Sequence, residues 1–132
     1  MYGRRTPWGA ALLLFSLVGA SACEPLWVVD LEQPMREIPE EYLRWFGEVA
    51  ECMGRERDAT PERFRVIRWY EGVEIRNPSE GKYALGLWVE PHKITVRTDV
   101  ADLDYVIKHE LVHELLRDGS HEQRFFKQCA GV

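Results

Sequence analysis

Residues 100–117 predict a helix whose circumference is almost entirely apolar, and a helix of that kind has to be buried on most sides. The same segment carries His109, Glu110 and His113, and His121 follows it closely. Burying that many ionisable side chains costs free energy unless each of them has a partner. The fold must therefore enclose this helix and also supply partners for its polar groups.

The N-terminal segment predicts an export signal rather than a part of the fold. Two arginines precede an apolar run of about eleven residues, and small residues then lead to Cys23. An apolar run this short does not form a stable membrane-spanning helix, which needs about 20 residues. We therefore expect residues 1–22 to be a signal peptide.

The cysteines favour a lipid anchor. The stretch GASAC, which ends at Cys23, resembles a bacterial lipobox, although ASA also satisfies the ordinary cleavage rule. The chain has three cysteines, and an odd number in an exported protein needs an explanation. If Cys23 carries lipid, Cys52 and Cys129 remain as a pair that can form a disulfide in an oxidising compartment. We expect a protein anchored by lipid in the bacterial cell envelope, on the periplasmic or outer-membrane face, with free secretion as the alternative.

The charge of the mature chain indicates no nucleic-acid partner. Removal of residues 1–22 deletes two arginines and no acidic residue, so Lys and Arg fall from 17 to 15 against 22 Asp and Glu, a net charge near −7. The remaining basic residues form no cluster of the kind that nucleic-acid-binding proteins present.

The chain of 132 residues is one domain's worth, and its hydrophobic spacing predicts an α+β fold. Three prolines in residues 24–39 indicate a tether, within which residues 26–29 could form a short strand. We expect a tether at 23–38 and a folded domain at 39–132. Within that domain the patterns predict a helix over 39–54, at least one strand within residues 63–75, a hairpin over 83–98, the buried helix, and a last helix over 121–130. Asp99 is expected to cap the buried helix and Gly119 to end it.

The pentapeptide HELVH, residues 109–113, has the pattern H-E-x-x-H. His109 and His113 project from one helix face, and Glu110 lies about 100° around the helix from His109. In this pattern two histidines hold zinc and the glutamate acts as a general base. Catalytic zinc usually has three protein ligands and keeps a position for water. A third ligand is therefore expected nearby.

His121 is the best candidate for that third ligand, because the chain can turn back after the glycine that ends the helix. Asp118 and Glu122 are rivals. Glu114 points away from the face that carries the two histidines, and is expected to be an orienting or surface carboxylate.

The sequence VIKHELVHELLRDGSHEQRFF resembles the active-site region of small zinc metalloproteases of the gluzincin type, and most closely that of SprT-like and WLM-like minimal zincins. Those proteins place a third histidine shortly after the helix, in a turn of the form GH that is followed by an aromatic residue. The matching residues here are Gly119, Ser120, His121 and Phe125 or Phe126. The resemblance covers residues 83–127. The metzincin pattern is not met, because it needs a histidine where Gly119 stands.

The resemblance implies a short, mostly antiparallel sheet packed on the active-site helix, with N- and C-terminal helices beside it. It implies a Zn²⁺ cofactor held by His109, His113 and His121. It also implies that Glu110 takes a proton from zinc-activated water, which then attacks a peptide carbonyl.

The implied substrate is a peptide or protein, held in extended form along an edge strand such as residues 83–90. Tyr83, His92 and Tyr105 are candidates for stabilising the oxyanion, and the sequence does not choose among them. His92 is expected to lie exposed in a turn, and Trp88 to belong to the core or to a cleft wall.

We therefore expect an exported, monomeric zinc metallopeptidase, attached to the membrane through lipid on Cys23. Two alternatives stay open. One is a zinc-stabilised binding or assembly lipoprotein without turnover, and the other is a metal-free structural lipoprotein with an accidental motif. Glu110 favours the peptidase over the first alternative, because a purely structural site needs no base.

Overall fold

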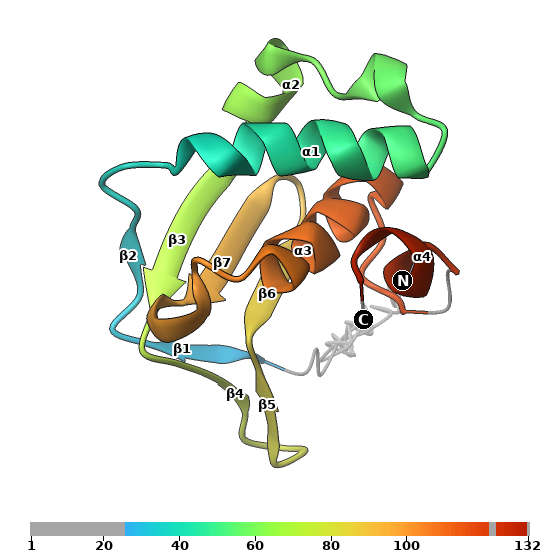
Figure 1. The fold of residues 1–132 in the computed structure, drawn as a ribbon. Helices are drawn as coiled ribbons and strands as arrows, with labels where there is room; N and C mark the ends of the chain where they lie inside the picture. Colours follow the sequence, from blue (N-terminus) through green and yellow to red (C-terminus); the bar gives the residue numbers. More distant parts are fainter. Residues whose placement is uncertain (1–25, 122–123, 132) are drawn as a thin grey trace, which may run out of the picture.

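The computed structural model describes residues 26–121 and 124–131, which form an α+β fold (Figure 1). The expected signal peptide and the predicted lipid attachment site, Cys23, lie outside the described residues. None of the helices that the structure describes is long and apolar enough to span a membrane.

In the described chain two strands precede α1, and the other five lie between α2 and α3. The helices are α1 (Glu40–Cys52), the 3-10 turn η1 (Glu56–Asp58), α2 (Pro61–Arg65), the 3-10 turn η2 (Thr98–Val100), α3 (Asp104–Leu116) and α4 (Phe125–Cys129). The strands are β1 (Val28–Asp30), β2 (Gln33–Pro34), β3 (Arg68–Gly72), β4 (Glu74–Asn77), β5 (Lys82–Ala84), β6 (Gly86–Val89) and β7 (Lys93–Arg97).

The strands form two sheets that are mostly antiparallel. The first has the order β1-β4-β5 and is antiparallel throughout. The second has the order β2-β3-β7-β6, in which only β3 and β7 run parallel. The predicted hairpin is confirmed, because β6 and β7 pair in antiparallel register. Strand β6 lies at the edge of its sheet, with β7 as its one neighbour.

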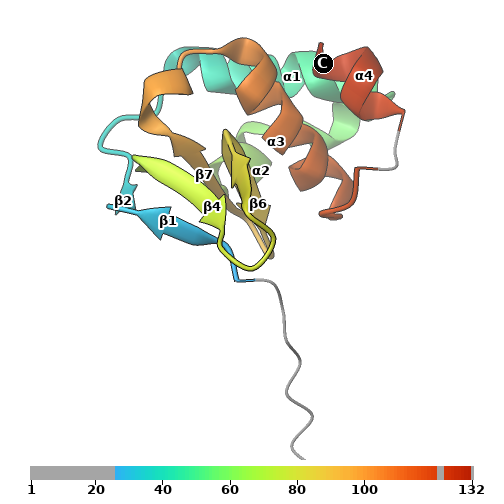
Figure 2. The same cartoon turned by 90° about the horizontal axis from the view of Figure 1, so that it is seen from below.

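Helix α3 is the buried helix that the sequence predicts. It packs against α1 and α4 on one side and against β6 and β7 on the other (Figures 1 and 2). Its apolar side chains are buried all round: Val106, Ile107, Leu111, Val112 and Leu115. Because α1 and α4 cover one side of α3 and β6 and β7 the other, the polar residues of α3 are held between the helical layer and the second sheet.

The predicted tether is shorter in the structure, because two strands lie within residues 23–38. The first, β1, pairs with β4, and the second, β2, pairs with β3. The short strand anticipated near residues 26–29 corresponds to β1. The fold therefore begins at Val28 rather than at Pro39. Strands of two or three residues have no recognisable sequence period, so only their distant partners reveal them.

The strand predicted within residues 63–75 is confirmed by β3 and by the start of β4, but it begins later than the apolar alternation suggests. The chain up to Arg65 is helical, and β3 begins only at Arg68. Thr60 starts α2, since its Oγ1 accepts a hydrogen bond from the Arg63 N–H at 3.2 Å, and Pro61 suits the first turn. This cap outweighs the short apolar alternation that follows it.

Asp99 does not cap α3, contrary to the prediction. Its carboxylate accepts two hydrogen bonds from the Arg97 guanidinium, at 2.6 and 2.8 Å. The helix starts later, at Asp104, with Leu103 in the capping position and no side-chain cap.

A disulfide joins Cys52 to Cys129 and confirms the predicted pair. It links the end of α1 to the end of α4, across a sequence separation of 77 residues. The last helix itself is shorter than predicted, since it runs over Phe125–Cys129 instead of 121–130. The disulfide thus fixes a helix too short to be stable alone.

Candidate metal centre and groove

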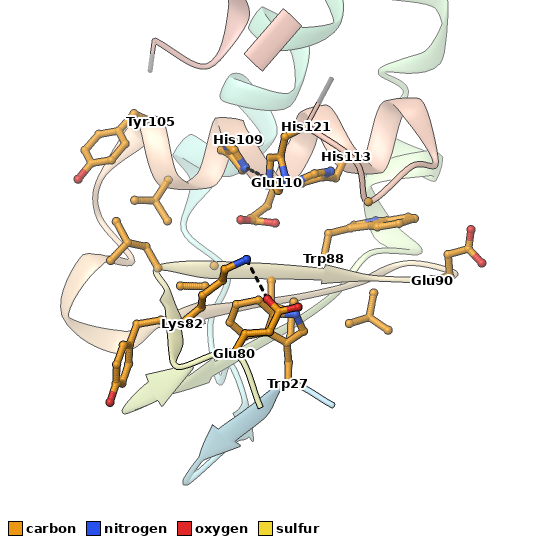
Figure 3. A pocket seen from close by; sticks show the side chains of 18 residues that line it. Trp27, Glu80, Lys82, Trp88, Glu90, Tyr105, His109, Glu110, His113 and His121 are labelled. Carbon is orange, nitrogen blue, oxygen red and sulfur yellow. Dashed lines mark hydrogen bonds and ion pairs between the residues drawn. The ribbon is translucent and has the colours of Figure 1, made fainter. Parts of the chain in front are cut away.

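Three histidines converge at the C-terminal half of α3. His109 and His113 lie one turn apart on that helix, and His121 follows it. Nε2 of His121 lies 3.0 Å from Nε2 of His109 and 3.2 Å from Nε2 of His113. The three potential ligand atoms all lie within 4.8 Å of one another, and Figure 3 shows the rings side by side. The predicted trio is therefore brought together.

The turn after α3 places the third histidine. Arg117 ends the helix in the left-handed conformation, with φ 56°, so the helix stops before the predicted Gly119. The backbone of Asp118 is a hydrogen-bond partner of His113, because the ring nitrogen Nδ1 lies 2.7 Å from the Asp118 carbonyl oxygen. Nδ1–H of His113 can donate to that carbonyl, which leaves Nε2 as the atom that could bind a metal ion.

The rival ligands do not join this cluster in the part of the chain that the structure describes. The Asp118 carboxylate accepts hydrogen bonds from the Ser120 N–H and Oγ–H, at 2.9 and 3.0 Å. Glu122 lies outside the described residues.

Burial favours the neutral form of two of the three histidines, His109 and His113. Burial, together with the nearby His113 and His121, lowers the pKa of His109 to about 4. Burial also lowers the pKa of His113, against the opposing effect of the Asp118 backbone. Neutral imidazole is a metal ligand and imidazolium is not, so His109 and His113 could bind a metal ion without first losing protons at neutral pH.

Glu110 lies beside the histidines with its carboxylate directed into the groove (Figure 3). Its side chain is buried, and burial raises the pKa of the carboxyl to about 8, partly offset by the Trp88 backbone. Gly86 on β6 makes room for it, since a Cβ at that position would lie 2.6 Å from Glu110 Oε1. The sequence analysis missed Gly86, although an isolated glycine in a strand is a signal of close approach.

The raised pKa of Glu110 predicts a loss of stability at high pH in the metal-free protein. The carboxyl titrates near 4.5 in the unfolded chain and near 8 in the fold, so its contribution is complete below pH 4.5 and is lost as pH rises to 8. Each unit of pKa difference corresponds to about 1.4 kcal/mol. Urea unfolding of the zinc-free protein should show this decline between pH 6.5 and 8, and the Glu110→Gln variant should not.

The histidines provide an internal check on that comparison. Because the pKa of His109 falls from 6.5 to about 4 on folding, the Glu110→Gln variant should gain stability as pH rises from 4 to 6.5, whereas in the wild type the loss from Glu110 offsets much of that gain above pH 4.5. Parallel curves above pH 6.5 would mean that Glu110 stays ionised in the metal-free fold.

The cluster opens onto a groove of about 1020 Å³ between α3 and the two sheets. Strand β6 runs along it, and the β5 segment and Trp27 form the wall opposite the histidines (Figure 3). Much of its lining is apolar or aromatic: Trp27, Tyr83, Leu85, Leu87, Trp88, Val89, Tyr105 and Val106. A pocket with an apolar lining and a few convergent polar groups is typical of a ligand-binding site.

The candidates for oxyanion stabilisation are separated by the structure. Tyr83 and Tyr105 line the groove and are exposed. His92 is not among the lining residues; it is half-buried, and its Nδ1 lies 2.6 Å from Glu114 Oε1. The expectation that His92 is exposed is therefore wrong. Of the two roles expected for Glu114, that of a surface carboxylate is also wrong, because Glu114 is only 2% exposed.

The aromatic residue predicted after the third histidine is Phe126. Its ring centroid lies 4.7, 4.6 and 5.2 Å from those of His109, His113 and His121. The ring therefore packs against all three histidines from α4, whereas Phe125 contacts the guanidinium of Arg124.

Comparisons of the chain with protein-family models, with curated proteins and with solved structures found no match. A functional assignment therefore rests on the residues and geometry described above.

Proposed function

We propose that this protein is a zinc-dependent metallopeptidase of the minimal zincin type. The observation that carries the proposal is the convergence of three imidazoles beside a buried glutamate, on the wall of an open groove. Nitrogens bound tetrahedrally to one zinc ion, at Zn–N distances of about 2.0–2.1 Å, lie about 3.3 Å apart. The Nε2 separations of 3.0 and 3.2 Å fit that arrangement.

The number of ligands favours a catalytic over a structural site. Structural zinc sites are closed by four protein ligands, whereas catalytic sites have three and keep one position open. The cluster contains three histidines and no fourth His, Cys, Asp or Glu within the described ranges. This count speaks against the alternative of a zinc-stabilised binding lipoprotein.

His109, His113 and His121 would hold the zinc ion, which when bound supplies Lewis-acid chemistry for polarising a peptide carbonyl and for acidifying water. Glu110 accepts a proton from the attacking water and passes it to the leaving amine. A cation held by the neighbouring histidines favours the ionised form of this carboxyl, and so opposes the effect of burial on its pKa.

The edge strand β6 is suited to hold the substrate. Its free edge borders the groove, and an extended peptide can add to such an edge through backbone hydrogen bonds. The predicted strand over residues 83–90 is split, because β5 pairs with β4 in the other sheet. We propose that β6 alone binds the peptide, and that Tyr83 or Tyr105 stabilises the oxyanion.

The proposal includes export and a lipid anchor on Cys23, in the bacterial cell envelope. The disulfide between Cys52 and Cys129 supports an oxidising compartment, because such bonds are rare where thiols are kept reduced. Its formation from two of the three cysteines also leaves Cys23 as the one available for lipid.

The first test is the zinc content of the purified protein. We expect one zinc ion per chain in the wild type and almost none in His113→Ala or His121→Ala, because two remaining ligands bind zinc weakly. The matched control is Asp118→Asn, which keeps an acceptor for Ser120 and should retain zinc. Atomic absorption on protein passed through a desalting column measures the content.

The pattern of losses identifies the ligands. Zinc that is lost from His113→Ala but kept by His121→Ala would assign the third position to Asp118 or Glu122. A wild-type protein that folds and takes up no zinc, even when zinc is supplied, would leave the histidines as core residues and remove the basis for a peptidase.

A further inference from the structure

Glu114 is a buried carboxylate that the proposed chemistry does not use. It is 2% exposed, and both of its oxygens have partners. Trp88 Nε1–H donates to Oε2 at 2.7 Å, and His92 Nδ1 lies 2.6 Å from Oε1. Removing a carboxylate from water is costly, and these short bonds compensate for part of that cost. An apolar residue would fill this position at a lower cost in free energy, which suggests that the Glu114 carboxylate has a specific role.

Glu114, Trp88 and His92 connect the helix that carries the histidines to the strand that borders the groove. Glu114 follows the ligand His113 on α3, Trp88 lies on the edge strand β6, and His92 lies in the turn between β6 and β7. The backbone carbonyl of His92 also accepts a hydrogen bond from the Arg68 N–H at 2.7 Å, which ties that turn to β3.

The indole ring links this network to the metal centre. Trp88 stacks on His113, with ring centroids 6.2 Å apart and planes inclined by 17°. The bond from Nε1 to Glu114 fixes the rotation of the indole, and the indole in turn limits the rotation of the imidazole. On its far edge His113 is fixed by the Asp118 carbonyl.

We propose that Glu114, Trp88 and His92 form a positioning clamp, which sets the orientation of His113 and holds β6 against α3. Glu114 acts through Trp88 on the ligand ring, and through His92 on the end of the strand that borders the groove. The inference rests on the metal centre of the proposed function but does not depend on hydrolysis.

The test compares zinc affinity in two tryptophan variants of the full chain. Trp88→Phe keeps an aromatic ring on His113 and loses the donor to Glu114, so zinc affinity should fall about 10- to 100-fold, as it does when groups that orient metal ligands are removed. Trp69→Phe is the matched control: Trp69 is also buried, and its Nε1 has no hydrogen-bond partner among the described residues. That variant should bind zinc as the wild type does. Competition with a chromophoric chelator measures both affinities.

A second pair of variants separates the hydrogen bonds from mere packing. Glu114→Ala should lose zinc affinity to the same extent as Trp88→Phe. Glu114→Gln should recover most of it, because its amide oxygen can still accept from Trp88 and its amide nitrogen can face His92. The thermal stability of each metal-free variant shows whether a loss of affinity is only a loss of fold.

The outcomes distinguish this inference from the proposed function. Equal zinc affinity in Trp88→Phe, Trp69→Phe and the wild type would overturn the clamp and leave the metallopeptidase intact. Equal losses in the two tryptophan variants would also overturn it, since packing alone would then explain the effect. A wild type that binds zinc without hydrolysing peptides would overturn the proposed function but not the clamp, and one that binds no zinc would overturn both.

Discussion

Replacing Glu110 with glutamine should lower kcat/KM for peptide hydrolysis by about 100- to 10,000-fold, the usual contribution of a general base. Glutamine has nearly the same volume, so it fits the space that Gly86 leaves beside the carboxylate. It cannot accept a proton at neutral pH. The histidines are untouched, so the variant should keep one zinc ion per chain. Cleavage of a quenched fluorescent peptide, measured on zinc-loaded protein, provides the rate.

The matched control for this change is Glu51→Gln, the same substitution on the exposed face of α1. It should leave both zinc content and rate unchanged. If Glu110→Gln hydrolyses peptides as fast as the wild type, the carboxylate is not the base and the mechanism is wrong. If the variant loses zinc as well as activity, Glu110 supports the site structurally and its role as a base stays untested by this substitution.

Gly86→Ala resolves that second outcome, because it displaces the carboxylate without removing it. The added methyl would lie 2.6 to 2.9 Å from three atoms of the Glu110 side chain, which then has to move. We expect a reduced rate with normal zinc content. Gly47→Ala is the control, since the methyl there meets no atom within 4 Å.

The parts of the site that lie close together in sequence could be predicted from sequence. His109 and His113 share a helix face because they are four residues apart, and the apolar residues around them fix that helix at the centre of the fold. The position of His121 beside the other two histidines was within reach of prediction because the turn that follows α3 is short. Each of these inferences needs only local geometry.

The parts that depend on distant segments could not be predicted in this way. A helical wheel places Glu114 away from the histidine face, but it does not show that Trp88 and His92 are its hydrogen-bond partners. Those partners lie 26 and 22 residues earlier in the chain, and only the packing of α3 on β6 brings them together. Strand β2 was missed for the same reason, because its pairing partner β3 follows α1.

Removal of the disulfide should destabilise the protein by about 4 kcal/mol, which is a large share of the stability of a small domain. The bond between Cys52 and Cys129 closes a loop with a sequence separation of 77 residues, and so restricts the unfolded chain strongly. Loss of the disulfide should also weaken zinc binding at the candidate metal centre. The bond anchors α4, and Phe126 on that helix packs against all three histidine rings.

Two measurements separate these effects. The double variant Cys52→Ser and Cys129→Ser should unfold at lower urea concentration than the wild type, with a proportionate fall in the free energy of unfolding, and should bind zinc more weakly. For the metal-free proteins, dithiothreitol should shift the urea unfolding of the wild type toward that of the double variant and leave the double variant unchanged, which excludes a direct effect of the reductant on unfolding. A wild type whose unfolding is insensitive to full reduction would show that α1 and α4 are held by packing alone. In that case Phe126 would keep its place over the histidines without the covalent link, and zinc affinity would be the same in the oxidised and reduced proteins.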